Sequence, residues 1–79
     1  MALFVYTVAL ANPDEVASEA TVATLVAWLH GIGRTEPGPP EWTAEWEADS
    51  GAEARRGIEA RLTSLPAHLP RLVIVDLHD

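Results

Sequence analysis

Two short segments near opposite ends of this 79-residue chain are rich in the side chains that favour β-strands. The first, Leu3 to Leu10, reads Leu-Phe-Val-Tyr-Thr-Val-Ala-Leu, and the second, Arg71 to Leu77, reads Arg-Leu-Val-Ile-Val-Asp-Leu. Both place apolar residues at odd and even positions, which is typical of strands that are buried on both faces. Pro66 and Pro70 end any helix that precedes the second segment. We therefore expect two strands that pair with each other.

The residues after the first strand carry the signals of a helix start. Asn12 is a good N-cap, Pro13 suits the first helical position, and the two acidic residues that follow complement the helix dipole. We expect this helix to extend to about His30, with Gly31 as the left-handed residue that closes it. Apolar side chains cover well over half of its circumference, so a second helix or a partner subunit must lie against it.

A second helix is expected after Ser50, because Glu53 follows three residues later as in a capping box. Gly57 lies inside this helix and weakens it by about 1 kcal/mol relative to alanine. One apolar face of the helix is formed by Ala54, Ile58, Leu62 and Leu65. The large side chains that we expect in the core of the protein are Phe4, Val26, Leu29, Ile58, Leu62 and Ile74.

The segment from Glu41 to Glu47 is compatible with either kind of element. Strict alternation would place Trp42, Ala44 and Trp46 on one face of a strand. The four-residue spacing of the two tryptophans after a Pro-Pro pair equally suits a short helix. We expect the helix, with the strand as the alternative.

These elements predict one α+β domain that spans residues 1–79. Its sheet has two strands, Leu3–Leu10 and Arg71–Leu77, packed with two or three helices. The alternative is a compact βαβαβ unit with parallel pairing and a third strand at Glu41–Glu47. A chain of this length buries only about 60% of its unfolded surface, so modest stability is expected.

Composition limits the class of protein further. At 48% hydrophobic residues, the chain is too apolar for wholesale disorder. It contains no cysteine, which excludes a disulfide framework and fits a reducing compartment. The N-terminus has no basic region and its apolar run ends at Ala11, which disfavours a signal peptide or a membrane span. We expect a cytoplasmic protein.

Motifs for catalysis are missing from the sequence. The Gly31-Ile32-Gly33 segment follows a predicted helix instead of opening one, so it is a cap and turn and not a phosphate loop. Asp76, His78 and Asp79 lie close together in sequence, but two or three ligands at a chain end indicate a polar strand end more than a metal site. We expect no enzymatic activity, no metal and no cofactor.

Half of the twelve carboxylates lie between Glu36 and Glu53, a stretch without arginine or lysine. The formal net charge of −7 disfavours direct binding to nucleic acid or to an anionic membrane, and it favours a basic protein partner. The candidate partner-binding residues are the carboxylates and the two tryptophans among them, namely Glu36, Glu41, Trp42, Glu45, Trp46, Glu47, Asp49 and Glu53.

Either conformation of this acidic segment aligns carboxylates in a row. In a helix, the residues that recur every four positions lie about 6 Å apart along one face, and these are Glu41, Glu45, Asp49 and Glu53. In a strand, alternate residues lie about 6.8 Å apart on one face, and these are Glu41, Thr43, Glu45, Glu47 and Asp49. Both spacings are about twice the ~3.4 Å between phosphates along one strand of duplex DNA. The tryptophans would anchor the contact, unless they belong to the core.

The short length, the net charge and the Glu36–Glu53 block resemble in kind the small acidic proteins by which phages and mobile elements inhibit host nucleic-acid machinery, including anti-CRISPR proteins. The likeness involves no shared motif. It implies an inhibitor that occupies a basic nucleic-acid-binding surface of a host complex by charge mimicry and blocks the binding of target DNA. One alternative is a homodimeric or adaptor module whose strand edges and apolar first helix are completed by another subunit. Another is an immunity protein or antitoxin that binds a basic toxin.

Overall fold

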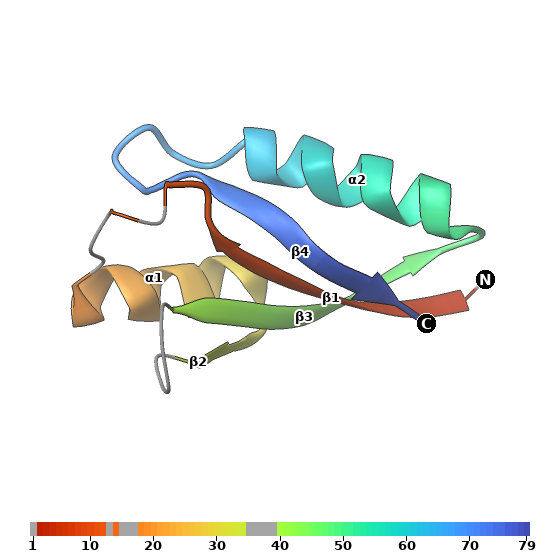
Figure 1. Cartoon of the computed structure of the whole chain (residues 1–79), viewed down its shortest axis with the longest axis horizontal. Coiled ribbons are helices and arrows are strands. Elements are labelled where there is room, and N and C mark those ends of the chain that lie inside the picture. Colours follow the sequence, from red (N-terminus) through yellow and green to blue (C-terminus); the bar gives the residue numbers. More distant parts are fainter. Residues whose placement is uncertain (1, 13, 15–17, 35–39) are drawn as a thin grey trace.

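A computed structural model describes residues 2–12, 14, 18–34 and 40–79 of the chain. Six elements follow one another in the order β1 (Ala2–Leu10), α1 (Glu19–Leu29), β2 (Ile32–Arg34), β3 (Glu41–Ala48), α2 (Gly51–Thr63) and β4 (Leu72–His78) (Figure 1). The strands form one sheet in the order β2-β3-β1-β4, and every neighbouring pair is antiparallel. This α+β arrangement has the element order and the strand order of the ferredoxin-like topology, in which two β-α-β units interleave.

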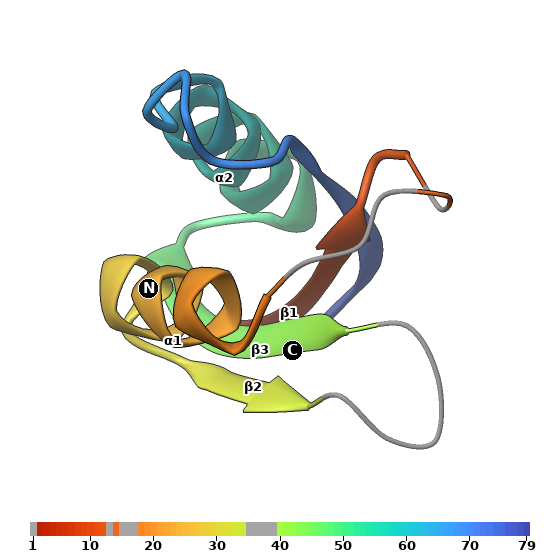
Figure 2. The same cartoon turned by 90° about the vertical axis from the view of Figure 1, so that its left-hand side faces the viewer.

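Both helices lie on the same face of the sheet, and the described residues leave the other face open (Figure 2). Helix α1 contacts β2 and β3, whereas α2 contacts β3 and β4. The core fills the space between these two layers. Its largest fully buried side chains are Trp42, Tyr6, Leu25, Ile58 and Val8. Of the six side chains expected in the core, Phe4, Leu29, Ile58 and Leu62 are buried, while Val26 and Ile74 are partly buried.

The prediction of a short helix at Glu41–Glu47 is wrong, because this segment forms β3. It pairs with β1 along its whole length, from Ala48 opposite Ala2 to Glu41 opposite Ala9. The alternating pattern of side chains explains the outcome. A strand places Trp42, Ala44 and Trp46 on one face and the residues between them on the other, whereas a helix would place Ala44 on the side opposite the two tryptophans. The expected two-stranded sheet is therefore too small. The alternative prediction has the third strand right, but its parallel pairing is wrong.

The two terminal strands pair as predicted. β1 and β4 are antiparallel, from Val5 opposite His78 to Leu10 opposite Leu72. The register shifts between Thr7 and Val8, which leaves Val75 as the additional residue of a β-bulge. The expectation that both faces of these strands are covered is wrong, because two helices cover only one face of the sheet.

Helix α1 begins later than predicted. Its N-cap is Ser18, whose hydroxyl oxygen accepts a hydrogen bond from the backbone N–H of Thr21 at 3.2 Å. The side-chain oxygen of Asn12 instead accepts from the N–H of Asp14 at 3.1 Å and shapes a turn after β1. Pro13 and Glu15 lie outside the described residues. Helix α2 begins as predicted, because the Ser50 hydroxyl accepts from the N–H of Glu53 at 3.2 Å.

The end of α1 shows a different use of glycine from the one expected. His30, and not Gly31, adopts the left-handed conformation, with a φ of 56°. Gly31 lies directly against β3, where a β-carbon would collide with the carbonyl oxygen of Thr43. Gly31 is needed for the close approach of two backbone segments. The left-handed conformation that closes the helix is adopted by His30, the residue before it, at a cost in backbone strain.

Candidate functional site

Strand β3 separates its side chains into two sets. Trp42, Ala44 and Ala48 are buried beneath the helices, and Trp46 is partly buried on the same side. The alternate residues belong to the opposite face of the sheet, the face that no helix covers. The carboxylate-bearing members of this second set, here named the carboxylate row, are Glu41, Glu45 and Glu47.

Within the carboxylate row, Glu41 has a paired strand on both sides, because β2 pairs with Glu41–Thr43, whereas Glu45 and Glu47 are paired with β1 alone. Glu45 and Glu47 are exposed, and Glu41 is partly exposed. By strand geometry, Glu45 and Glu47 are about 6.8 Å apart and the whole row spans about 20 Å. The backbone of Glu45 and Glu47 is held by the ladder of hydrogen bonds to β1, which fixes the direction in which their side chains leave the sheet.

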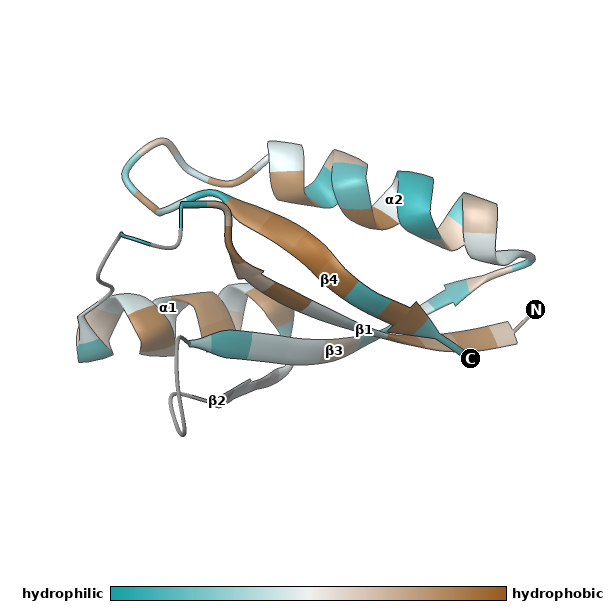
Figure 3. Ribbon diagram, in the orientation of Figure 1, coloured by the Kyte–Doolittle hydropathy of each residue, from teal (hydrophilic) through white to brown (hydrophobic). Residues whose placement is uncertain are grey.

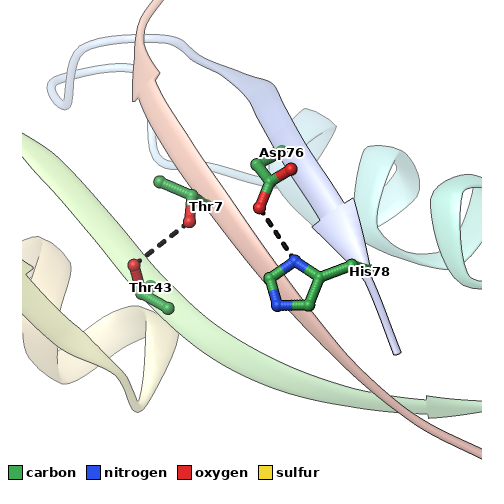
Figure 4. Close-up of polar contacts among 4 residues, drawn as sticks. All are labelled: Thr7, Thr43, Asp76 and His78. Carbon is green, nitrogen blue, oxygen red and sulfur yellow. Dashed lines mark hydrogen bonds and ion pairs between the residues drawn. The ribbon is translucent and has the colours of Figure 1, made fainter.

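The β1 residues opposite this row carry no charge. Glu47 faces Leu3, and Glu45 faces Val5. The hydroxyl groups of Thr7 and Thr43 lie 3.2 Å apart and form a hydrogen bond across the two strands (Figure 4). Neighbouring side chains on β1 therefore do not neutralise Glu45 and Glu47, and an apolar strip lies beside them, whereas Glu41 lies opposite Arg34 of β2.

A second polar group lies on β4, at the far side of β1. Asp76 and His78 share one strand face, and the Asp76 carboxylate is 2.8 Å from Nδ1 of His78 (Figure 4). Both side chains are 58% exposed, so this pair belongs to the open surface and not to an enclosed pocket. The open face thus has an apolar centre along β1 with polar groups on each flank.

The rest of the acidic segment does not join the carboxylate row. Asp49 is exposed in the connection between β3 and α2. Glu53 is exposed in the first turn of α2, on the helical side of the sheet. Glu36 lies outside the described residues. The structure therefore brings together three of the six predicted carboxylates and separates two of them from that group.

Neither tryptophan of this segment lies on the open face. Trp42 is fully buried, and its indole Nε1 donates a hydrogen bond to the carbonyl oxygen of Val22 at 3.3 Å. Trp46 lies against α2 at Gly57, where a β-carbon would be only 2.7 Å from its Cζ2 atom. Both side chains serve the contact between the sheet and the helices, so Trp42 is not available to anchor a partner.

Three exposed apolar side chains extend the candidate surface, and the sequence analysis did not identify them. Leu3 is 50% exposed, Val73 is 45% exposed and Val75 is 52% exposed. The available signal was the apolar character of both faces of the terminal strands. The two helices of the described residues cover one of those faces and leave the other without a helix.

A separate polar cluster lies between the helices, on the other side of the sheet. The Arg61 guanidinium stacks 4.4 Å from the centre of the Trp28 ring, and its Nη2 donates to the Trp28 carbonyl oxygen at 2.6 Å. Burial raises the pKa of Tyr6 above its usual range, and the charge of Arg61 offsets part of that shift. Tyr6 and Arg61 also line a cavity of about 580 Å³. Arg61 is a link between the C-terminal end of α1 and α2.

No protein-family model matches the chain, and no curated protein or solved structure is significantly similar to it. Among the described residues, neither helix has the length and the apolar character needed to cross a bilayer.

Proposed function

We propose that the protein is an inhibitor that binds a basic protein surface through the carboxylate row, in place of the nucleic acid which that surface normally holds. The observation that carries this proposal is the position of Glu45 and Glu47. They are exposed on the open face of β3, and the β1 residues opposite them are uncharged.

The geometry of the row suits the recognition of lysine and arginine side chains. Glu45 and Glu47, about 6.8 Å apart, correspond to every second phosphate of one DNA strand. Because a sheet holds these charges rigidly, less conformational entropy is lost on binding than with a flexible acidic tail. Leu3 lies opposite Glu47 and adds apolar contact area next to the charges, as interfaces commonly require.

The distribution of charge supports a protein partner over nucleic acid. A surface of aligned carboxylates repels phosphates, and the net charge of −7 adds to that repulsion. Complementary charge accelerates association with a basic partner and makes the association rate depend on ionic strength. Inhibition follows because one basic surface cannot hold the protein and the DNA at the same time.

The test is a competition experiment with a matched charge control. A basic DNA-binding protein captured from the native host is mixed with a labelled duplex, and release of the duplex is followed by gel shift. Wild-type protein is expected to release the duplex, and Glu45→Lys/Glu47→Lys is expected to lose this effect. The control, Glu53→Lys/Glu59→Lys, makes the same change of charge on α2 and is expected to retain it.

Two results would contradict the proposal. Equal loss of competition in both variants would show that only the total charge matters. Retention of competition in the Glu45→Lys/Glu47→Lys variant would show that the partner binds elsewhere. Melting temperatures of both variants are measured alongside, and both are expected to stay near the wild-type value because exposed ion pairs contribute little to stability.

A further inference from the structure

Within the described part of the chain, no strand pairs with the outer edge of β4. β4 is the terminal strand of the sheet, and its described neighbours are β1 alongside it and α2 on one face. The N–H of Ala11 donates to the carbonyl oxygen of Arg71 at 2.9 Å, which marks a hydrogen-bonded pair. Because such pairs alternate along an antiparallel ladder, Val73 also directs its backbone groups toward β1. Leu72 and Ile74 direct theirs outward.

This edge has little of the protection that natural sheet edges usually carry. The strand has no lysine or proline, and the stretch Leu72–Val75 is entirely apolar, as its colour in Figure 3 shows. Val73 and Val75 are two of the three exposed large hydrophobic residues in the described part of the chain. The bulge at Val75 is a protective feature, but it leaves the regular ladder from Leu72 to Ile74 accessible.

We propose that β4 pairs with β4 of a second copy of this chain, antiparallel and about a two-fold axis at Val73. Leu72 of each copy then lies opposite Ile74 of the other, and the outward backbone groups form four hydrogen bonds in total. Val73 meets its counterpart on the open face. The two sheets become one continuous eight-stranded sheet.

The apolar character and the shape of this edge favour a second copy as its occupant. In this register Arg71 lies opposite Val75 of the other copy, and its guanidinium donates to the Leu65 carbonyl oxygen of its own chain at 3.2 Å. The contact between copies is therefore mainly apolar, because Leu72 meets Ile74 twice and Val73 meets its counterpart. A cavity of about 470 Å³ lies beside the edge, lined by Leu62, Leu72 and other residues of α2 and β4. Ile74 of the second copy would point to the same side as Leu72 and cover this cavity.

The net charge of −7 on each copy does not prevent this pairing. β1 separates β3 from β4 in each copy, so five strand spacings lie between the two carboxylate rows, about 24 Å in all. This distance is about three times the Debye length of ~8 Å at physiological ionic strength. Repulsion between the rows is therefore screened, and added salt is expected to strengthen the association.

Sedimentation equilibrium tests the proposal on the whole chain. The wild-type protein is expected to shift from 8.5 kDa toward twice that mass as its concentration rises. Val73→Lys places two like charges on the two-fold axis and is expected to raise the dimer dissociation constant by about tenfold or more. Leu3→Lys is the matched control, because it makes the same change at a residue of similar exposure on the central strand β1. It is expected to leave the dissociation constant within about twofold of wild type.

Hydrogen exchange on the wild-type protein gives a second test that needs no variant. The amides of Leu72 and Ile74 are expected to gain protection as the concentration rises, while the amide of Val73 stays protected throughout by β1. A monomer at every concentration would overturn the proposal, as would exchange at Leu72 and Ile74 that is independent of concentration. Dimerisation that Leu3→Lys weakens as much as Val73→Lys would place the interface on the open face instead. A monomer at every concentration leaves the inhibitor proposal intact, because that proposal concerns β3 and predicts that salt weakens binding.

Discussion

The substitution Gly57→Ala separates the energetics of an isolated helix from those of this fold. Glycine inside a helix is less favourable than alanine by about 1 kcal/mol, so helix propensity alone predicts that the substitution stabilises the protein. In the structure, the new β-carbon would lie 2.7 Å from Cζ2 of Trp46 and 3.0 Å from its Cε2 and Nε1. The clash involves the indole ring, which is attached to β3 and partly buried against α2.

Adding a methyl group to a well-packed contact typically costs about 1–3 kcal/mol. After the propensity gain of about 1 kcal/mol is subtracted, we expect Gly57→Ala to lower the free energy of unfolding by about 1 kcal/mol. In a domain of this size, such a loss corresponds to a fall of about 4–8 °C in melting temperature. Thermal and urea unfolding followed by circular dichroism measure the change.

Two further variants establish the cause. Gly51→Ala adds a methyl group at the start of the same helix, where the nearest atom is 3.9 Å away on Phe4, and it is expected to stabilise by up to about 1 kcal/mol. In a Trp46→Leu background, Gly57→Ala is expected to become stabilising, because the indole is gone. A higher melting temperature for Gly57→Ala in the wild-type background would refute the reasoning, since it would mean that Trp46 does not pack against α2 as described.

Three other predictions follow from the buried and charged residues. Ile58→Ala removes a side chain that is 1% exposed and is expected to cost about 2–5 kcal/mol, measured by urea unfolding, and an unchanged midpoint would contradict its place in the core. The folded state holds the phenolic proton of Tyr6 more tightly than the unfolded state, because burial raises its pKa. The free energy of unfolding is therefore expected to be unaffected by Tyr6 ionisation below the usual tyrosine pKa, and to fall as the pH rises above it. Tyr6 is the single tyrosine of the chain, so tyrosinate absorbance follows it directly, and Arg61→Gln should move its ionisation to still higher pH. Finally, gel shift at low salt is expected to show no binding of the protein alone to duplex DNA, and a shift reversed by salt would refute the charge argument.

The fold was partly predictable from the sequence. The terminal strands, their pairing and the helix start at Ser50 depend on local residue patterns, and the structure confirms them. The error at Glu41–Glu47 has a physical cause, because the residue types suit a helix as well as a strand. The choice was made by burial, since only a strand places Trp42 in the core while Glu45 and Glu47 remain exposed.

The candidate site was predicted in part. The residues that would form one row in a strand were identified correctly as a set, but Asp49 follows the end of β3 and does not belong to it. The exposed apolar residues of β1 and β4 were missed, because their exposure depends on both helices packing on the same face. No local pattern in the sequence states on which face of a sheet a helix lies.

The alternation along β3 also protects the register of the sheet. A slip of one residue against β1 would move Glu45 and Glu47 beneath the helices and would turn Trp42 toward solvent. Burying two unpaired carboxylates costs far more than any pairing in the wrong register returns. Glu45 and Glu47 thus add little to the stability of the native state, but they disfavour the sheet in which β3 is shifted by one residue against β1. Residues on the open face of β3 can therefore be replaced without loss of the register, provided that they stay polar, whereas the tryptophans and alanines between them are fixed by the core.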